Sequence, residues 1–165
     1  MNTITYCHRI GGPLGSMLLL AAGDRLTVID FDDSRNAPLQ SADWRAGAHH
    51  SLLRAAETQL AEYFAGERAV FDLPLAPTGT PFQQSVWTAI RTVPAGATIS
   101  YRELAIRAGR PGSSRAAGTA TGRNPLAIVI PCHRIIGRDG NLTGYRWGVP
   151  RKRALLEKER AEAGK

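Results

Sequence analysis

The sequence predicts an α+β protein with an N-terminal antiparallel sheet and one helix, followed by a C-terminal half made mainly of helices. Short apolar runs divided by turn residues fill the first half, whereas capped helical segments fill the second. Between them, the stretch from Leu73 to Thr80 is rich in Pro and Gly, aperiodic, and typical of a linker. Because 165 residues suffice for two small domains, we expect one at 1–78 and one at 79–165.

Three short runs predict the strands of the first domain: Thr3 to His8, Met17 to Ala22, and Leu26 to Phe31. The turn residues Gly11-Gly12-Pro13 and Gly23-Asp24 separate these runs. Strands joined by such short turns are expected to pair antiparallel.

A helix is expected from about His50 to Phe64, with Gly66 as its stop signal. Its apolar residues have the spacing of one buried helix face; they are Leu52, Leu53, Ala56, Leu60 and Phe64.

Capping signals open the helices of the second domain. Thr80-Pro81-Phe82-Gln83 combines an N-cap Thr, Pro at the first helical position, and Gln three residues after the cap. Ser100-Tyr101-Arg102-Glu103 is a second capping box, and its short helix is expected to stop at Gly109. After a turn, Ser113 or Ser114 is expected to cap a third helix that runs to about Gly122. Two short helices joined by a Gly-containing turn are a helix-turn-helix candidate.

The second helix of this candidate pair has only small side chains between Arg115 and Arg123. A helix that reads the major groove usually carries long polar side chains, so this narrow one is better suited to the minor groove of DNA. The alternative is a close-packed buried helix, although the two arginines argue against complete burial.

The charge is distributed unevenly along the chain. The net charge is +7, but residues 1–80 carry 6 Lys/Arg against 9 Asp/Glu, and residues 81–165 carry 15 against 5. This asymmetry indicates that only the second half faces a polyanion, unless the protein simply comes from an arginine-rich proteome.

Met17 to Ala22 is too short for a membrane span or a signal-peptide core. Two distant cysteines without a CxxC pair fit free thiols in a reducing cytoplasm, where we expect the protein.

The candidate nucleophile is Cys132, which follows the apolar run Leu126 to Ile130 and the direction change at Pro131. A free thiol needs a base or a positive field to react near neutral pH, and His133 can serve through a bridging water. The alternative is a buried structural cysteine beside an incidental histidine.

A carboxylate on the last helix favours the reactive interpretation. The helix begins at Val149-Pro150, and Glu159 shares its apolar stripe with Leu155, Leu156 and Lys152. A buried carboxylate needs a partner, which is either Lys152 in an ion pair or a histidine that it orients. The alternative is a solvated amphipathic helix.

The run Ile130-Pro131-Cys132-His133-Arg134-Ile135-Ile136-Gly137 resembles the active-site signature of the O6-alkylguanine-DNA alkyltransferases, also called methylated-DNA–protein-cysteine methyltransferases. The resemblance covers about residues 79–160 in order and spacing. Residues 1–78 match only the general character of the family's N-terminal domain. Other matching segments are Phe82-Gln83-Gln84-Ser85-Val86-Trp87, Ser100-Tyr101, Ser114 to Gly118, Asn124-Pro125 and Thr143-Gly144-Tyr145.

The resemblance implies a ribonuclease H-like N-terminal domain and a winged helix-turn-helix-like C-terminal domain that carries the active site. It implies that Cys132 accepts the alkyl group. His133 would activate the Cys132 thiol through a water molecule, and Glu159 would polarise His133. Asn124 would brace the active-site turn, and Tyr101 would help to rotate the nucleotide and donate to the leaving guanine.

The resemblance also assigns DNA and substrate contacts. Arg115 would fill the space left by the flipped base, which must leave the duplex to be reached. The remaining implied DNA contacts are Ser100, Ala116, Thr119 and Arg123. The implied guanine pocket comprises Pro131, Ile135, Tyr145, the backbone of Arg146, Trp147 and Lys152.

The implied reaction is single-use transfer of an alkyl group, chiefly methyl, from O6 of guanine and also from O4 of thymine. We expect no cofactor and no metal, because Cys7, His8, His49 and His50 are zinc ligands only in type. The expected partner is double-stranded DNA with O6-alkylguanine, bound through its minor groove by a monomer that can act cooperatively; no membrane partner is expected.

Rival functions and one departure from the pattern remain. Cys132 excludes the alkyltransferase-like proteins, which lack the cysteine. A helix-turn-helix regulator would carry longer side chains that read base edges, and a Cys-His hydrolase would need an oxyanion hole that the sequence does not reveal.

Where many relatives have Tyr-x-Gly-Gly, this chain has Tyr145-Arg146-Trp147-Gly148. We expect Trp147 to narrow the pocket mouth and to disfavour benzyl-sized groups.

Overall fold

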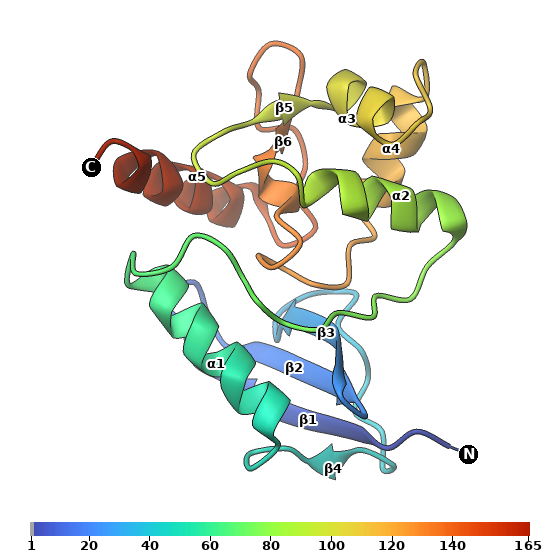
Figure 1. Ribbon diagram of the computed structural model, residues 1–165, viewed down its shortest axis with the longest axis vertical. Helices are drawn as coiled ribbons and strands as arrows, with labels where there is room; N and C mark the ends of the chain where they lie inside the picture. The colour runs from blue at the N-terminus through green and yellow to red at the C-terminus, as the bar shows by residue number, and fades with distance from the viewer. Residues whose placement is uncertain (1) are drawn as a thin grey trace. The chain divides into compact units, whose positions relative to one another are not determined.

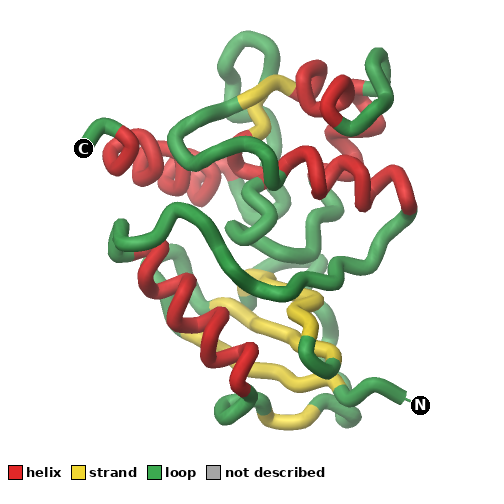
Figure 2. The backbone as a smooth tube through the Cα atoms, in the orientation of Figure 1, coloured by secondary structure: helices red, strands yellow, loops and turns green. Residues whose placement is uncertain are grey.

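The computed structural model describes residues 2–165 and confirms the α+β class (Figure 1). The chain divides into two compact units, one ending at Pro77 and the other beginning at Thr78. The first unit holds a sheet and one helix, whereas the second holds four α-helices and a two-stranded sheet (Figure 2). That 1–78 and 79–165 behave as separate domains stays a prediction.

The sheet of the first unit has the strand order β3-β2-β1-β4. β1 (Thr5–Ile10), β2 (Met17–Ala22) and β3 (Arg25–Phe31) pair antiparallel in succession, as predicted. β1 lies two residues later than predicted because Ile10 pairs with Met17 at the turn. The expectation of a purely antiparallel sheet is wrong at β4 (Arg45–Ala46), which pairs parallel to β1. Both β4 residues are exposed, so no apolar run signals this strand in the sequence.

Helix α1 (Ser51–Phe64) packs against the sheet of its unit. The predicted residues Leu52, Leu53, Ala56 and Leu60 are buried. At the end of the helix Tyr63 is the buried aromatic residue and Phe64 is partly exposed, contrary to the predicted stripe.

In the second unit, α2 (Pro81–Ile90) opens with the predicted capping box. The Thr80 side chain accepts from the Gln83 backbone N–H, and the Gln83 side chain accepts from that of Thr80. Val86 and Ile90 are fully buried, and Trp87 Nε1 donates to the carbonyl of Ala120 at 2.9 Å. This bond ties α2 to the small-residue helix.

The helix-turn-helix candidate consists of α3 (Tyr101–Arg107) and α4 (Ser114–Thr121), which pack together. The Ser100 side chain accepts from Glu103 N–H as predicted, but the Glu103 carboxylate bonds Arg107 instead of closing the box. Ser113 is the N-cap of α4, yet its side chain makes no capping bond within residues 2–165, so that part of the prediction is wrong. Its φ of −104° and ψ of 40° depart from the usual extended cap conformation.

The remaining elements bring the candidate nucleophile and the last helix together. A 3₁₀ turn, η1 (Cys132–Arg134), leads into β6 (Ile135–Ile136), which pairs parallel with β5 (Ile99–Ser100). Helix α5 (Val149–Ala163) begins where Val149-Pro150 predicted and packs against η1. Among the residues described, no helix has the length and apolar character needed to cross a membrane.

Candidate active site

Asn124 organises the turn that leads to Cys132. Its Nδ2 donates to the carbonyls of Leu126 and Ile130, at 3.3 and 2.8 Å, and its Oδ1 accepts from Leu126 N–H at 2.9 Å. Within this turn the buried Ile128 has a φ of 70°, a strained conformation for a β-branched residue. The Asn124 side chain thus bonds both ends of the strained segment.

The thiol of Cys132 lies at the end of this turn with 2% of the residue exposed. Burial raises its pKa to about 11, although a hydrogen bond from Asn124 Nδ2 to Sγ at 3.2 Å and the charges of Lys152 and Arg146 act in the opposite direction. The thiol is therefore protonated in the unbound protein and needs a base before it can act as a nucleophile.

His133 and Glu159 form a buried, hydrogen-bonded pair between η1 and α5. Glu159 is 2% exposed, so it lies on the buried face that the sequence predicted. His133 Nε2 lies 2.7 Å from Glu159 Oε1. Burial opposes ionisation of Glu159, but hydrogen bonds from His133 and Arg134 hold its pKa well below the usual range. An ionised carboxylate only accepts, so Nε2 carries a proton, and in the neutral ring Nδ1 presents the lone pair.

The structure decides between the two partners that the sequence offered for Glu159. The partner is His133, whereas Lys152 Nζ donates to the carbonyl of Gly144 at 3.1 Å. Burial lowers the pKa of Lys152, and the nearby Cys132 raises it. Arg134, which the sequence reasoning missed, also binds Glu159.

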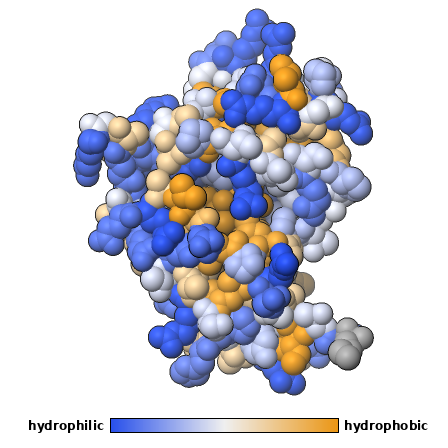
Figure 3. All heavy atoms as spheres, in the orientation of Figure 1, coloured by the Kyte–Doolittle hydropathy of each residue, from blue (hydrophilic) through white to orange (hydrophobic). Residues whose placement is uncertain are grey.

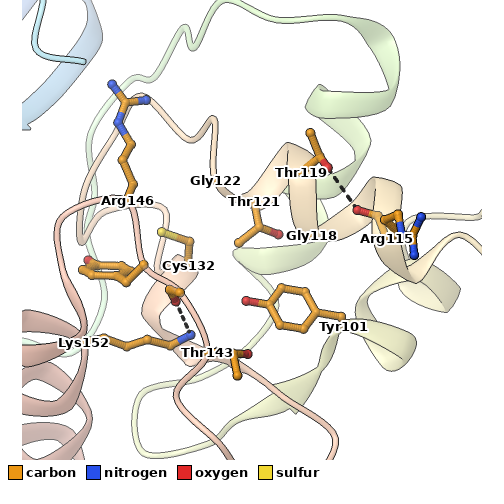
Figure 4. Close-up of a pocket in the computed structure, with 12 residues that line it drawn as sticks. Tyr101, Arg115, Gly118, Thr119, Thr121, Gly122, Cys132, Thr143, Arg146 and Lys152 are labelled. Atoms are coloured by element: carbon orange, nitrogen blue, oxygen red, sulfur yellow. Dashed lines mark hydrogen bonds between the residues drawn. The ribbon is translucent and has the colours of Figure 1, made fainter. Parts of the chain in front are cut away.

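A pocket of about 410 Å³ opens in front of the thiol (Figure 4). Figure 4 shows the hydroxyl of Tyr101 aimed into it from α3, the Lys152 ammonium on the opposite side, and Arg115 at its far end on α4. The predicted residues that line it are Tyr101, Arg115, Thr119, Cys132, Tyr145, Arg146 and Lys152. The pocket also has small or short lining residues that the sequence analysis did not single out by role, namely Gly118, Thr121, Gly122, Thr143 and Gly144.

Helix α4 is buried on one side and exposed on the other, so its small side chains serve both close packing and a narrow exposed surface. Ala117, Ala120 and Thr121 are buried against the unit, whereas Arg115, Ala116, Thr119 and Arg123 are exposed. In Figure 3 the surface at the upper end of the view, over α3 and its neighbouring loops, is mostly hydrophilic. Exposed arginines on and around the helix pair are Arg102, Arg107, Arg110, Arg115 and Arg123.

Comparison with known proteins places this site in a family. The family model described as "6-O-methylguanine DNA methyltransferase, DNA binding domain" matches residues 81–161, and the model described as its "ribonuclease-like domain" matches residues 5–77. The chain belongs to this methyltransferase family. The resemblance drawn from the residues around Cys132 is thereby confirmed.

Individual relatives agree over nearly the whole chain. A methylated-DNA–protein-cysteine methyltransferase of Mycobacterium tuberculosis is 45% identical, covering 96% of this chain and 94% of that protein. One of Methanosarcina barkeri is 44% identical, covering 93% and 96%. A crystal structure of the M. tuberculosis protein in complex with DNA superposes with a TM-score of 0.86 at 43% identity, covering 95% of this chain and 94% of that one.

Several residues assigned from the methyltransferase resemblance lie outside the pocket lining. Asn124 donates to Cys132 Sγ, His133 and Glu159 are buried as a pair, and Pro131 and Ile135 are also buried. Ser100 caps α3, Ala116 is exposed on α4, and Arg123 is exposed just after the end of that helix. Their DNA and substrate contacts stay predictions.

Trp147 differs most from its expected place in this methyltransferase. It is 4% exposed and packs edge-on against Tyr145, with ring centroids 5.3 Å apart, instead of standing at the mouth. The Arg146 guanidinium carbon lies over the Trp147 ring, 5.3 Å from the ring centroid, and Arg146 Nη1 donates to the carbonyl of Asn124. Trp147 therefore supports two lining residues from behind, so any narrowing of the pocket by it is indirect.

Replacing Trp147 by Gly is expected to increase inactivation by O6-benzylguanine. Loss of the indole removes the support of Tyr145 and Arg146 and gives the 145–148 loop room to move. The measurement is the rate of loss of alkyl-transfer activity during incubation with the free base. An unchanged rate in a folded variant would contradict the role of Trp147 in limiting group size.

The structure also shows where the zinc-type residues of the N-terminal unit lie. His8 Nε2 pairs with Glu57 at 2.8 Å, and the ring of His50 stacks at a tilt on Tyr6. No cluster of three or more His, Cys, Asp or Glu suited to a metal ion occurs in the part of the chain that the structure describes.

Proposed function

We propose that this protein repairs DNA by transferring an alkyl group, chiefly methyl, from O6 of guanine to Sγ of Cys132. O4-alkylthymine, which presents the same kind of alkylated exocyclic oxygen, is a second substrate in this proposal. The observation that carries it is the Cys132 thiol at the pocket, followed in the chain by His133, which is held in a buried pair with Glu159. Membership of the methyltransferase family gives this arrangement its chemistry.

The proposed reaction is a displacement at the alkyl carbon. His133 Nδ1, which is buried and has no hydrogen-bond partner among residues 2–165, receives the thiol proton through a bridging water. A sulfur lone pair then forms the S–C bond while the C–O6 bond breaks and its electron pair stays on the base. Tyr101, whose pKa burial raises, keeps its proton at neutral pH and donates it to the guanine ring.

The product of this displacement is a thioether, which does not revert under ordinary conditions. One molecule is therefore expected to repair one lesion and then to be spent, without a cofactor. This stoichiometry separates the proposal from a Cys-His hydrolase, whose acyl-enzyme is released by water at each turn.

Contact with the duplex is assigned to α4. We infer that the protein binds DNA as a monomer, with the narrow exposed surface of α4 in the minor groove. Several monomers can bind cooperatively in this proposal. The base must be rotated out, because the thiol is buried and the alkylated oxygen is stacked inside the duplex. The exposed Arg115, at the far end of the pocket, is suited to fill the space that the base leaves.

An Arg115→Ala variant is expected to repair duplex DNA more slowly but to react normally with free O6-benzylguanine. Loss of about 1.4 kcal/mol of compensation for unstacking would slow duplex repair about tenfold. Arg54→Ala removes another exposed helical arginine, from α1, and should leave both rates unchanged. Equal slowing on both substrates would show that Arg115 serves the pocket and not the duplex.

The test of the proposed function uses duplex DNA with radiolabelled O6-methylguanine. Incubation with excess DNA should transfer one label per protein molecule, and peptide mapping should find it on the peptide that contains Cys132. Release of labelled methanol, or many repaired lesions per molecule, would overturn the proposal.

A further inference from the structure

Arg134 is buried against the acid-base pair, although the reaction described above gives it no part. It is 6% exposed, and its guanidinium is held on three sides. Nε donates to Glu159 Oε2 at 3.0 Å, Nη2 donates to Glu159 Oε1 at 2.8 Å, and Nη1 donates to the carbonyl of Val93 at 2.7 Å. The Val93 bond also anchors the guanidinium to the segment after α2, in addition to its two bonds with Glu159.

The important feature is that His133 and Arg134 share one carboxylate oxygen. Glu159 Oε1 accepts from His133 Nε2 at 2.7 Å and from Arg134 Nη2 at 2.8 Å. A carboxylate paired with a histidine alone stabilises the protonated imidazolium. When the same oxygen already faces a guanidinium, its attraction for a proton on the imidazole is weakened.

We propose that Arg134 is a positioning residue of the alkyl transfer, which holds the Glu159 carboxylate as a shared acceptor and keeps His133 neutral with Nδ1 unprotonated. The proposal rests on the proposed function for its kinetic consequence, because only a neutral His133 can accept the thiol proton. Arg134 acts through Glu159 and His133 and is not itself in the pocket lining.

The charges around His133 agree with this role. Burial lowers the pKa of His133, Glu159 raises it, and Arg134 and Lys152 lower it. Glu159 and Lys152 come from α5, whereas Arg134 and Cys132 belong to the η1 turn that carries His133 itself. Helix α2, which also packs against η1, has no ionisable side chain between Pro81 and Ile90. Without Arg134, Glu159 would still raise the pKa of His133. Among the described groups named here, only the charge of Lys152 would then oppose that increase.

The alternative is that Arg134 serves only to neutralise Glu159 as a structural ion pair. Both interpretations predict that losing Arg134 weakens the fold, because it leaves a buried carboxylate with one partner fewer. They differ in the protonation of His133, which a purely structural pair would not alter in a variant that still folds.

The experiment follows the imidazole nitrogens of His133 by ¹⁵N NMR in the wild type, Arg134→Met and Arg134→Lys, with the signals assigned by their loss in His133→Gln. In the wild type, His133 is expected to stay neutral with the proton on Nε2 from pH 8 down to pH 6. In Arg134→Met its titration midpoint should rise by about one pH unit or more, which is about a tenfold change in proton affinity. Arg134→Lys keeps a cation beside Glu159 and should restore most of the wild-type behaviour.

The rate of methyl transfer supplies the second readout. Its acid limb should move to higher pH in Arg134→Met by the same amount as the His133 midpoint, and Arg134→Lys should move it back. A folded Arg134→Met protein with the wild-type midpoint would overturn the inference. If Arg134→Met does not fold, the wild type still decides, since a charged His133 at pH 7 or a proton on Nδ1 would overturn it equally.

The two proposals fail in distinguishable ways. If the wild type transfers no methyl group to Cys132, the proposed function fails while the NMR titration still tests the effect of Arg134 on His133. If transfer occurs and the titration is insensitive to Arg134, only the present inference fails.

Discussion

A Cys132→Ser variant is expected to transfer no label from O6-methylguanine while still binding the alkylated duplex. A hydroxyl is a far weaker nucleophile than a thiolate, and the buried His133 cannot compensate by deprotonating it. The serine oxygen can accept the Asn124 Nδ2 bond that Sγ accepts at 3.2 Å, so the turn should keep its shape. Covalent transfer is measured on denaturing gels, and duplex binding by gel shift at fixed salt concentration.

Cys7→Ser is the matched control for this variant. Cys7 is the second free cysteine of the chain and lies, partly exposed, in β1. Its replacement should leave both transfer and binding at the wild-type level. Label on Cys132→Ser protein, or loss of transfer in Cys7→Ser, would mean that Cys132 is not the acceptor.

The second large effect is expected from Glu159→Gln, which should lose both stability and activity. Gln preserves the size of the side chain but leaves the buried Arg134 guanidinium without a counter-charge. Breaking a buried pair in this way costs about 3–5 kcal/mol of unfolding free energy. An amide can also donate to His133 Nε2, so the tautomer that presents Nδ1 as the base is no longer enforced.

The pH dependence gives this prediction its sign. Because the folded-state pKa of Glu159 is depressed, its stabilising contribution is present above the unfolded pKa of about 4.3 and is lost as the pH falls further. The difference in unfolding free energy between wild type and Glu159→Gln should therefore be full at pH 7 and shrink below about pH 4.3. Urea unfolding at several pH values measures it.

Glu157→Gln is the control on the same helix. Glu157 is exposed on α5, two residues before Glu159, and its neutralisation should change stability by less than about 0.5 kcal/mol. Equal effects of the two substitutions would show that the charge of α5, and not the buried contact with His133 and Arg134, is responsible.

Features encoded by neighbouring residues were predictable from the sequence. The capping box at Thr80, the start of α5 at Val149-Pro150 and the buried position of Glu159 all depend on groups within one or two helical turns. The active-site signature around Cys132 was likewise continuous in sequence, which allowed the family to be identified before the fold was known.

Features that depend on distant contacts were not predictable in the same way. The β4 pairing and the choice between Lys152 and His133 as the partner of Glu159 each follow from packing between separate segments. Arg134 shows this most clearly, because its three bonds reach Val93 and Glu159, which are 41 and 25 residues away.

The sequence by itself therefore determined that Cys132 is the candidate nucleophile and that an acid lies on the buried face of the last helix. Only the tertiary structure decided that this acid is shared between His133 and Arg134. The physical reason is that local hydrogen bonds and apolar periodicity are set by near neighbours in the chain, whereas the packing of η1 against α5 decides which buried charges meet.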